Sequence, residues 1–115
     1  MDMNTYQAKA LTTDTFNVPN EVDLKDFGLI NKVLGLSGES GEVADKIKKI
    51  LRNKDGAIKE EERLEIIKEL GDVLWYLATL SRYLGADLDQ VAKVNLDKLA
   101  DRHKRGVIKS KGDNR

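Results

Sequence analysis

Apolar residues recur at helical spacing along three long segments, and this pattern limits what the chain can fold into. They fall in one arc of each segment, at about 23–52, 60–84 and 88–105, when residues are placed about 100° apart around a helix axis. A shorter helix is expected at about residues 4–13. The only proline, Pro19, lies outside all four segments, so no segment is interrupted. The sequence therefore predicts an all-α fold.

Polar residues and glycines mark the expected ends of these helices. Asn4, Asp23 and Asp87 are the predicted N-terminal caps, and Gln90 completes a capping-box-like start for the last helix. The stretch NKDG, together with Gly85 and Gly106, marks the expected helix ends. Short connections favour antiparallel neighbours, so we expect a protomer resembling an antiparallel four-helix bundle. Residues 1–106 are predicted to form a single domain, followed by a polar tail at 107–115.

Size and charge exclude several classes of protein. A domain of 115 residues hides only about two-thirds of its unfolded surface, so we expect oligomerisation to complete the fold. Twenty basic and twenty acidic residues give no net charge, which argues against nucleic-acid and polybasic membrane partners. The chain has no cysteine, no apolar signal segment and no membrane-length apolar run, so a cytoplasmic location is expected.

Carboxylates flank the apolar stripe on two of the expected helices. Glu39 and Glu42 lie beside the stripe of the second helix, and Glu69 and Asp72 lie beside that of the third. Two carboxylates about 4 Å apart repel by roughly 4 kcal/mol at an effective dielectric constant of 20, so a bound cation would relieve them. Oxygen ligands alone suit Mg²⁺, with Mn²⁺ as the alternative. By spacing alone, a solvated and ion-paired face is the commoner explanation for these acids, because the chain is rich in charge. Their position beside the apolar stripe and the nearby glycines favour the metal site.

Gly35, Gly38 and Gly41 surround the first acidic pair inside a helix, where each glycine costs roughly 1 kcal/mol relative to alanine. Glycine allows a ligand or a second backbone to approach closely. A tight helix crossing and a ligand site both explain the three glycines, and the two explanations are compatible.

The sequence segments around these acids resemble those of the MazG-like nucleoside triphosphate pyrophosphohydrolases. They are GLSGESGEVADKIKK with Glu39 and Glu42, ELGDVLWYLATLS with Glu69 and Asp72, and NLDKLADRHKRG near the end of the chain. The resemblance covers about residues 6–106 and implies an all-α enzyme that hydrolyses a (d)NTP to a (d)NMP and pyrophosphate. In such enzymes a metal-activated water attacks the α-phosphate. Control or sanitation of the nucleotide pool is the role that the resemblance implies.

The resemblance also implies roles for individual residues. Glu39, Glu42, Glu69 and Asp72 correspond to the catalytic metal ligands, without showing which one polarises the water. The expected phosphate-binding residues are Lys98, Arg102 and Lys46, and the expected nucleotide-binding residues are Asn95, Tyr76 and Trp75. Relatives with one short domain form homodimers or homotetramers with the site near a subunit interface, so a homo-oligomer is expected.

Several of these residues also have a purely structural interpretation. Trp75 is the only tryptophan, and we favour its burial at a subunit interface over stacking on a base. Packing is the simpler explanation for Tyr76, and a structural role is the simpler one for His103. Packing is likewise the simpler explanation for three residues near the N-terminus, in a part that helps to enclose the base in relatives: Tyr6, Gln7 and Phe16.

Two other functions remain open from the sequence. A non-catalytic helical interaction or regulatory module could retain the fold, and an absence of metal binding would favour it. A di-iron bundle requires Glu-x-x-His pairs, and the single histidine, with Ala100 three positions before it, argues against that class.

Overall fold

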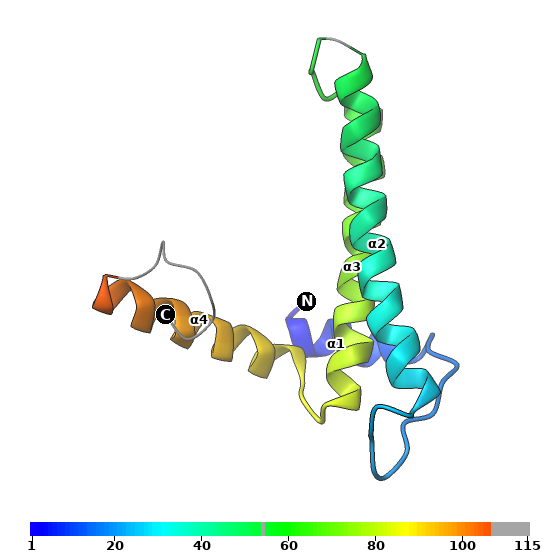
Figure 1. The fold of residues 1–115 in the computed structure, drawn as a ribbon, viewed down its shortest axis with the longest axis vertical. Helices are drawn as coiled ribbons and strands as arrows, with labels where there is room; N and C mark the ends of the chain where they lie inside the picture. The colour runs from blue at the N-terminus through cyan, green and yellow to red at the C-terminus, as the bar shows by residue number, and fades with distance from the viewer. Residues whose placement is uncertain (54, 107–115) are drawn as a thin grey trace.

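The computed structural model describes residues 1–53 and 55–106. These residues form four helices and no strand, which confirms the all-α prediction (Figure 1). The helices are α1 (Met3–Leu11), α2 (Phe27–Arg52), α3 (Glu60–Tyr83) and α4 (Leu88–Arg105). None of the helices in this described part is long and apolar enough to cross a membrane. The predicted polar tail at residues 107–115 lies outside the described residues.

Two of the predicted N-terminal caps are wrong by a few residues. Asp2 caps α1, since its carboxylate accepts a hydrogen bond from the Thr5 N–H at 2.7 Å, whereas Asn4 lies inside the helix. Asp26 caps α2 by accepting from the Gly28 N–H at 2.8 Å. Asp23 instead accepts from the Lys25 N–H at 2.8 Å. Its side chain therefore stabilises a turn before the helix, a use that competes with capping.

The later helix ends follow the predicted signals. The side chain of Glu62 accepts from the Lys59 N–H at 3.0 Å at the start of α3. The Asp87 carboxylate accepts from the Gln90 N–H at 2.7 Å and caps α4 as predicted. Gly85 and Gly106 take positive φ values of 67° and 73° just after α3 and α4, a conformation that side chains disfavour.

The small core lies where α1 crosses α3 near the start of α4. Buried Ala10, Ala78 and Leu88 form its centre. Gln7 is buried beside them, and its side-chain amide donates to the Ala78 carbonyl at 3.0 Å. The amide oxygen of Gln7 accepts from the Leu88 N–H at 3.0 Å. One side chain thus joins α1 to α3 and to the first residue of α4, which confirms the packing interpretation of Gln7.

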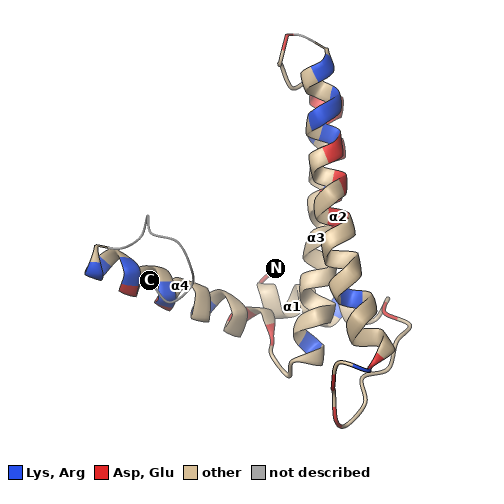
Figure 2. Cartoon of the chain, viewed as in Figure 1, with Lys and Arg blue, Asp and Glu red and all other residues tan. Residues whose placement is uncertain are grey.

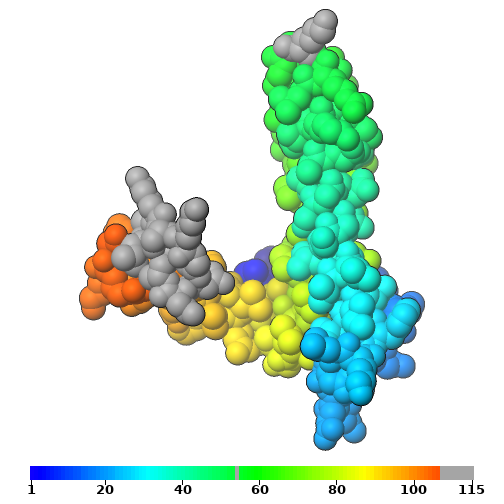
Figure 3. Space-filling model, viewed as in Figure 1, coloured from blue at the N-terminus to red at the C-terminus, as the bar shows by residue number. Residues whose placement is uncertain are grey.

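The helices do not form one closed bundle within the chain. α2 and α3 run side by side as a long antiparallel pair, whereas α4 leads away from this pair (Figures 1 and 3). Of the other helices, α4 contacts α1 and α3 but not α2. The radius of gyration is 17.1 Å, against about 13 Å for a compact domain of this length. The bundle prediction is therefore corrected for α4.

The open arrangement leaves apolar surface uncovered. An apolar groove of about 390 Å³ runs between the start of α2 and the end of α3. It is lined by Leu24, Leu29, Ile30, Val33, Leu34, Leu80 and Leu84. Val91, Val94 and Leu96 on α4 are also exposed. This surface is compatible with the expected oligomerisation, which stays a prediction.

Candidate metal centre

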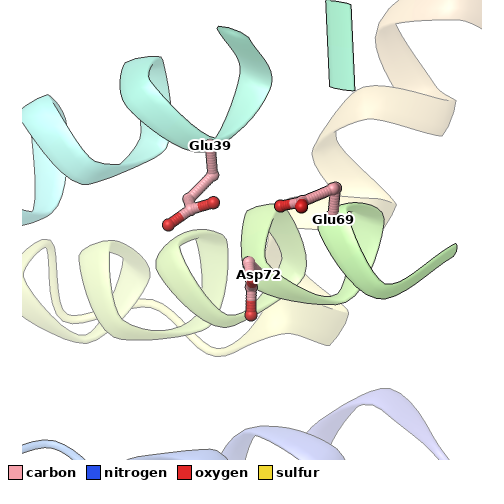
Figure 4. Close-up of side chains that lie close together, drawn as sticks. All are labelled: Glu39, Glu69 and Asp72. Carbon is pink, nitrogen blue, oxygen red and sulfur yellow. The ribbon is translucent and has the colours of Figure 1, made fainter. Parts of the chain in front are cut away.

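Three carboxylates meet halfway along the α2–α3 pair. Glu39 on α2 and Glu69 on α3 point toward one another, and Asp72 lies one turn further along α3 (Figure 4). One carboxylate oxygen from each residue lies within 4.8 Å of the other two. Residues 30 positions apart in the chain come together because the two helices are antiparallel. The structure thus unites three of the four acids singled out in the sequence.

A close contact between the same two helices lies beside this cluster. The ring of Tyr76, one turn after Asp72, packs against Gly35, one turn before Glu39, and a Cβ atom on Gly35 would clash with it. Gly38 and Gly41 have no neighbouring atom within 4 Å of such a Cβ position. Only Gly35 of these three glycines is therefore explained by helix packing in the single chain. The ring of Tyr76 thus fills the space that Gly35 leaves between the two helices.

Mutual repulsion acts on the clustered carboxylates. Partial burial raises the pKa of Glu39, and the charges of Asp72, Glu69 and Glu42 raise it further. Burial also raises the pKa of Tyr6 on α1, and the charge of Asp72 makes a smaller contribution in the same direction. The negative charge concentrated on these carboxylates favours the binding of a cation.

Glu42, the fourth predicted ligand, is exposed and lies outside the group of three. Its charge nevertheless contributes to the raised pKa of Glu39, so it is within electrostatic reach of the cluster. Its role as a ligand stays a prediction.

Lys46 adds a positive charge to the edge of the cluster. Its ammonium lies 3.9 Å from a carboxylate oxygen of Glu69 and 4.0 Å from one of Glu65. Glu65 also accepts a hydrogen bond from Lys68, which lowers the pKa of Glu65 more than Lys46 does. Figure 2 shows that charged residues are concentrated in the half of the α2–α3 pair where α2 ends and α3 begins. Sequence analysis did not single out Glu65, because acidic residues three positions apart are common by chance in a charge-rich chain.

The residues on α4 that were predicted to bind phosphate (Lys98 and Arg102) or the nucleotide (Asn95) are not brought to this cluster in the single chain. Asn95 is exposed, Lys98 is half-buried and Arg102 is buried. All three lie on the helix that leads away from α2 (Figure 1). Their predicted roles therefore require another arrangement of α4 or a second chain.

Trp75 is held by its own chain. Its indole N–H donates to the Thr13 hydroxyl at 2.8 Å, and its ring meets that of Tyr76 edge-on at 4.9 Å between centroids. Trp75 also packs against the small core near α1 and is partly buried there. Part of the Trp75 side chain is thus buried within its own chain, where we had expected burial at a subunit interface. A nucleotide-binding role for Trp75 or Tyr76 stays a prediction.

The donor set fits a hard divalent cation. Glu39, Glu69 and Asp72 offer only carboxylate oxygens, with no histidine or cysteine among them. Glu39 and Glu69 are partly buried whereas Asp72 is exposed, so one side of the group is open to solvent. Such a site can hold an ion and leave coordination positions for water or phosphate.

The fold and this site agree with the comparison to known families. Residues 29–107 match the MazG nucleotide pyrophosphohydrolase domain, and the chain belongs to that family. The match includes all three clustered carboxylates. Members of the family are typically metal-dependent.

A relative extends the likeness to the whole chain. The gene 37 protein of Mycobacterium phage L5 is 45% identical over 115 residues, which are 100% of both chains. The similarity thus includes α1 and the connector before α2, which precede the matched domain. No solved structure matches the chain.

Proposed function

We propose that the protein is an Mg²⁺-dependent pyrophosphohydrolase that converts a (d)NTP into a (d)NMP and pyrophosphate. The observation that carries this proposal is the meeting of Glu39, Glu69 and Asp72 within a MazG domain. The family membership supports a nucleotide substrate, and the triphosphate is the substrate that the resemblance implies, with the cationic residues on α4 as its expected ligands. Nucleotide-pool control or sanitation is the proposed role.

Each group of residues has a defined task in this reaction. Glu39, Glu69 and Asp72 would hold the cation, and Glu42 is proposed as a fourth ligand from the family resemblance. Bound Mg²⁺ would supply charge neutralisation on the triphosphate and activation of water. Lys98 and Arg102 would hold the phosphates, with Lys46 nearby, and Asn95 would contact the nucleotide. Water oxygen bonds to the α-phosphorus, the bond to the bridging oxygen breaks, and pyrophosphate leaves while one proton passes to solvent.

The direct test is a panel of NTPs and dNTPs incubated with the protein and Mg²⁺, with pyrophosphate and orthophosphate measured separately. We expect pyrophosphate from at least one nucleotide. Glu39→Gln and Asp72→Asn should each lower that rate by at least about a hundredfold, because each removes a ligand charge. Glu61→Gln, at an exposed position in the first turn of α3, is the matched control. Absence of pyrophosphate from every nucleotide would refute the proposal.

The exposed apolar groove is also compatible with the alternative function, a non-catalytic interaction or regulatory module. A helical interaction or regulatory module would use such a surface without catalysis. Calorimetry separates the two functions, because the enzyme must bind Mg²⁺ or Mn²⁺ and the module need not. Loss of the heat of metal binding in Glu39→Gln would support the enzyme.

A further inference from the structure

Lys46 occupies an intermediate position between two carboxylates on α3. Its ammonium is 3.9 Å from Glu69 and 4.0 Å from Glu65, so both distances exceed a hydrogen bond. Among the ion pairs between α2 and α3, those of Lys46 alone reach the carboxylate cluster. The ammonium is therefore near Glu69 without being fixed to it.

Glu65 already has a partner on its own helix. One of its oxygens accepts a hydrogen bond from Lys68 at 2.9 Å, and the other oxygen faces Lys46. Glu65 lies one helical turn before Glu69, so both carboxylates project toward the same part of α2. Lys46 thus has a second carboxylate within reach that does not belong to the cluster.

A divalent cation and an ammonium group compete for the same carboxylate. The carboxylate of Glu69 cannot make a close contact with both at once, because the divalent cation and the ammonium group repel one another at short range. The lysine side chain is flexible and can change partner at little cost. We propose that Lys46 competes with the divalent cation for Glu69, and that Glu65 is a positioning residue that receives the ammonium when the cation binds.

This inference rests on the proposed metal site, and it has a consequence for how that site binds metal and nucleotide. Lys46 weakens the binding of the free ion, because the ion must displace it from Glu69. A triphosphate offers Lys46 further anionic oxygens, so nucleotide binding and metal binding assist each other. The site would then fill preferentially with metal and nucleotide together.

The test is calorimetric titration of the protein with Mg²⁺, and separately with Mn²⁺, without nucleotide. Lys46→Met should bind either ion on the order of tenfold more tightly than wild type, as expected for removing one nearby positive charge. Lys46→Arg should bind close to wild type because it keeps the charge. Lys48→Met is the matched control, since Lys48 lies on the same helix and pairs with Asp45.

Glu65 is tested by a double-mutant cycle on the same titration. Glu65→Gln should weaken metal binding by about threefold in wild type, because Lys46 then has only Glu69 as a partner. In the Lys46→Met background the same change should have a smaller effect. Equal effects in both backgrounds would show that Glu65 acts only through its own charge, and would overturn its positioning role.

The proposal fails if Lys46→Met binds Mg²⁺ no more tightly than Lys48→Met, or if no variant binds either ion. The pyrophosphate assay distinguishes this failure from that of the proposed function. Wild type that releases pyrophosphate while Lys46→Met shows unchanged metal affinity would refute only the role of Lys46. Absence of pyrophosphate in every variant would refute the proposed function as well.

Discussion

The ammonium of Lys32 on α2 lies 2.7 Å from a carboxylate oxygen of Asp14, with side-chain exposures of only 2% and 0%. The same ammonium lies over the ring of Phe16, 4.6 Å from its centroid, and over that of Trp75, at 4.8 Å. Asp14 belongs to the connector between α1 and α2. This buried pair therefore fastens the connector against the helix pair that carries the carboxylate cluster.

Removing one partner of this pair should destabilise the protein strongly. Lys32→Met leaves the Asp14 charge buried without its counter-ion, which we expect to lower the free energy of unfolding by about 3–5 kcal/mol. Lys32→Met combined with Asp14→Asn should recover part of that loss, because no buried charge remains. Urea denaturation measures both, with Lys48→Met as the exposed control. A single mutant as stable as the double mutant would contradict the importance of this pair.

The three glycines near Glu39 should differ in their response to alanine. Gly35→Ala drives a methyl group into the Tyr76 ring and should destabilise α2 against α3. Gly38→Ala and Gly41→Ala meet no neighbouring atom and should each stabilise the helix by up to about 1 kcal/mol. Thermal and urea unfolding would measure these differences. Destabilisation by Gly38→Ala comparable to that by Gly35→Ala would indicate a close neighbour that the single chain does not contain.

The burial of Glu39, together with repulsion within the carboxylate cluster, should appear in the pH dependence of stability. The pKa of Glu39 is raised in the folded chain, so the folded state binds its proton more tightly than the unfolded state does. Stability without metal should therefore fall as pH rises through this raised pKa. Above it, Glu39→Gln should melt about 1–3 °C higher than wild type. The difference should vanish below the ordinary glutamate pKa of 4.5.

Thermal melts with a chelator present check this dependence, and Glu61→Gln serves as the control. Adding Mg²⁺ should raise the melting temperature of wild type more than that of Glu39→Gln, because the variant has lost a ligand. A Glu39→Gln variant that melts below wild type at neutral pH would show that burial and repulsion do not disfavour the charged form of Glu39 in the folded chain.

The helices could be predicted from local spacing, whereas the clustered acids were predicted from their position beside the apolar stripes and from the family resemblance. Glu39, Glu69 and Asp72 flank stripes that must face one another, so pairing the stripes brings the acids together. The contact between Lys32 and Asp14 was missed, since a lysine in a charge-rich helix gives no signal of burial and its partner lies in the connector.

The direction of α4 relative to α2 and α3 could not be predicted from the sequence either. An apolar stripe shows that a helix face should be covered, but not which surface covers it. α4 has such a stripe, yet beyond its first residues it leads away from α2 and α3 (Figure 1). Whether Asn95, Lys98 and Arg102 reach the carboxylates is thus decided by tertiary or quaternary structure and not by spacing.

Mixing two inactive variants would decide where α4 acts. α4 does not contact α2 in the single chain, so Lys98 is expected to serve the carboxylate cluster of a second copy. Glu39→Gln and Lys98→Met should each be inactive alone. When mixed and allowed to exchange subunits, they should recover about a quarter of wild-type activity, since half the dimers are mixed and each has one intact site.

The control for this experiment is a mixture of Glu39→Gln with Asp72→Asn. Both carboxylates belong to one cluster within one chain, so no arrangement of these subunits gives an intact site and no activity should return. Native mass spectrometry would verify that the subunits exchange. If exchange occurs and Glu39→Gln with Lys98→Met also stays inactive, Lys98 does not act across the interface. A reorientation of α4 toward its own cluster would then be required for the proposed chemistry.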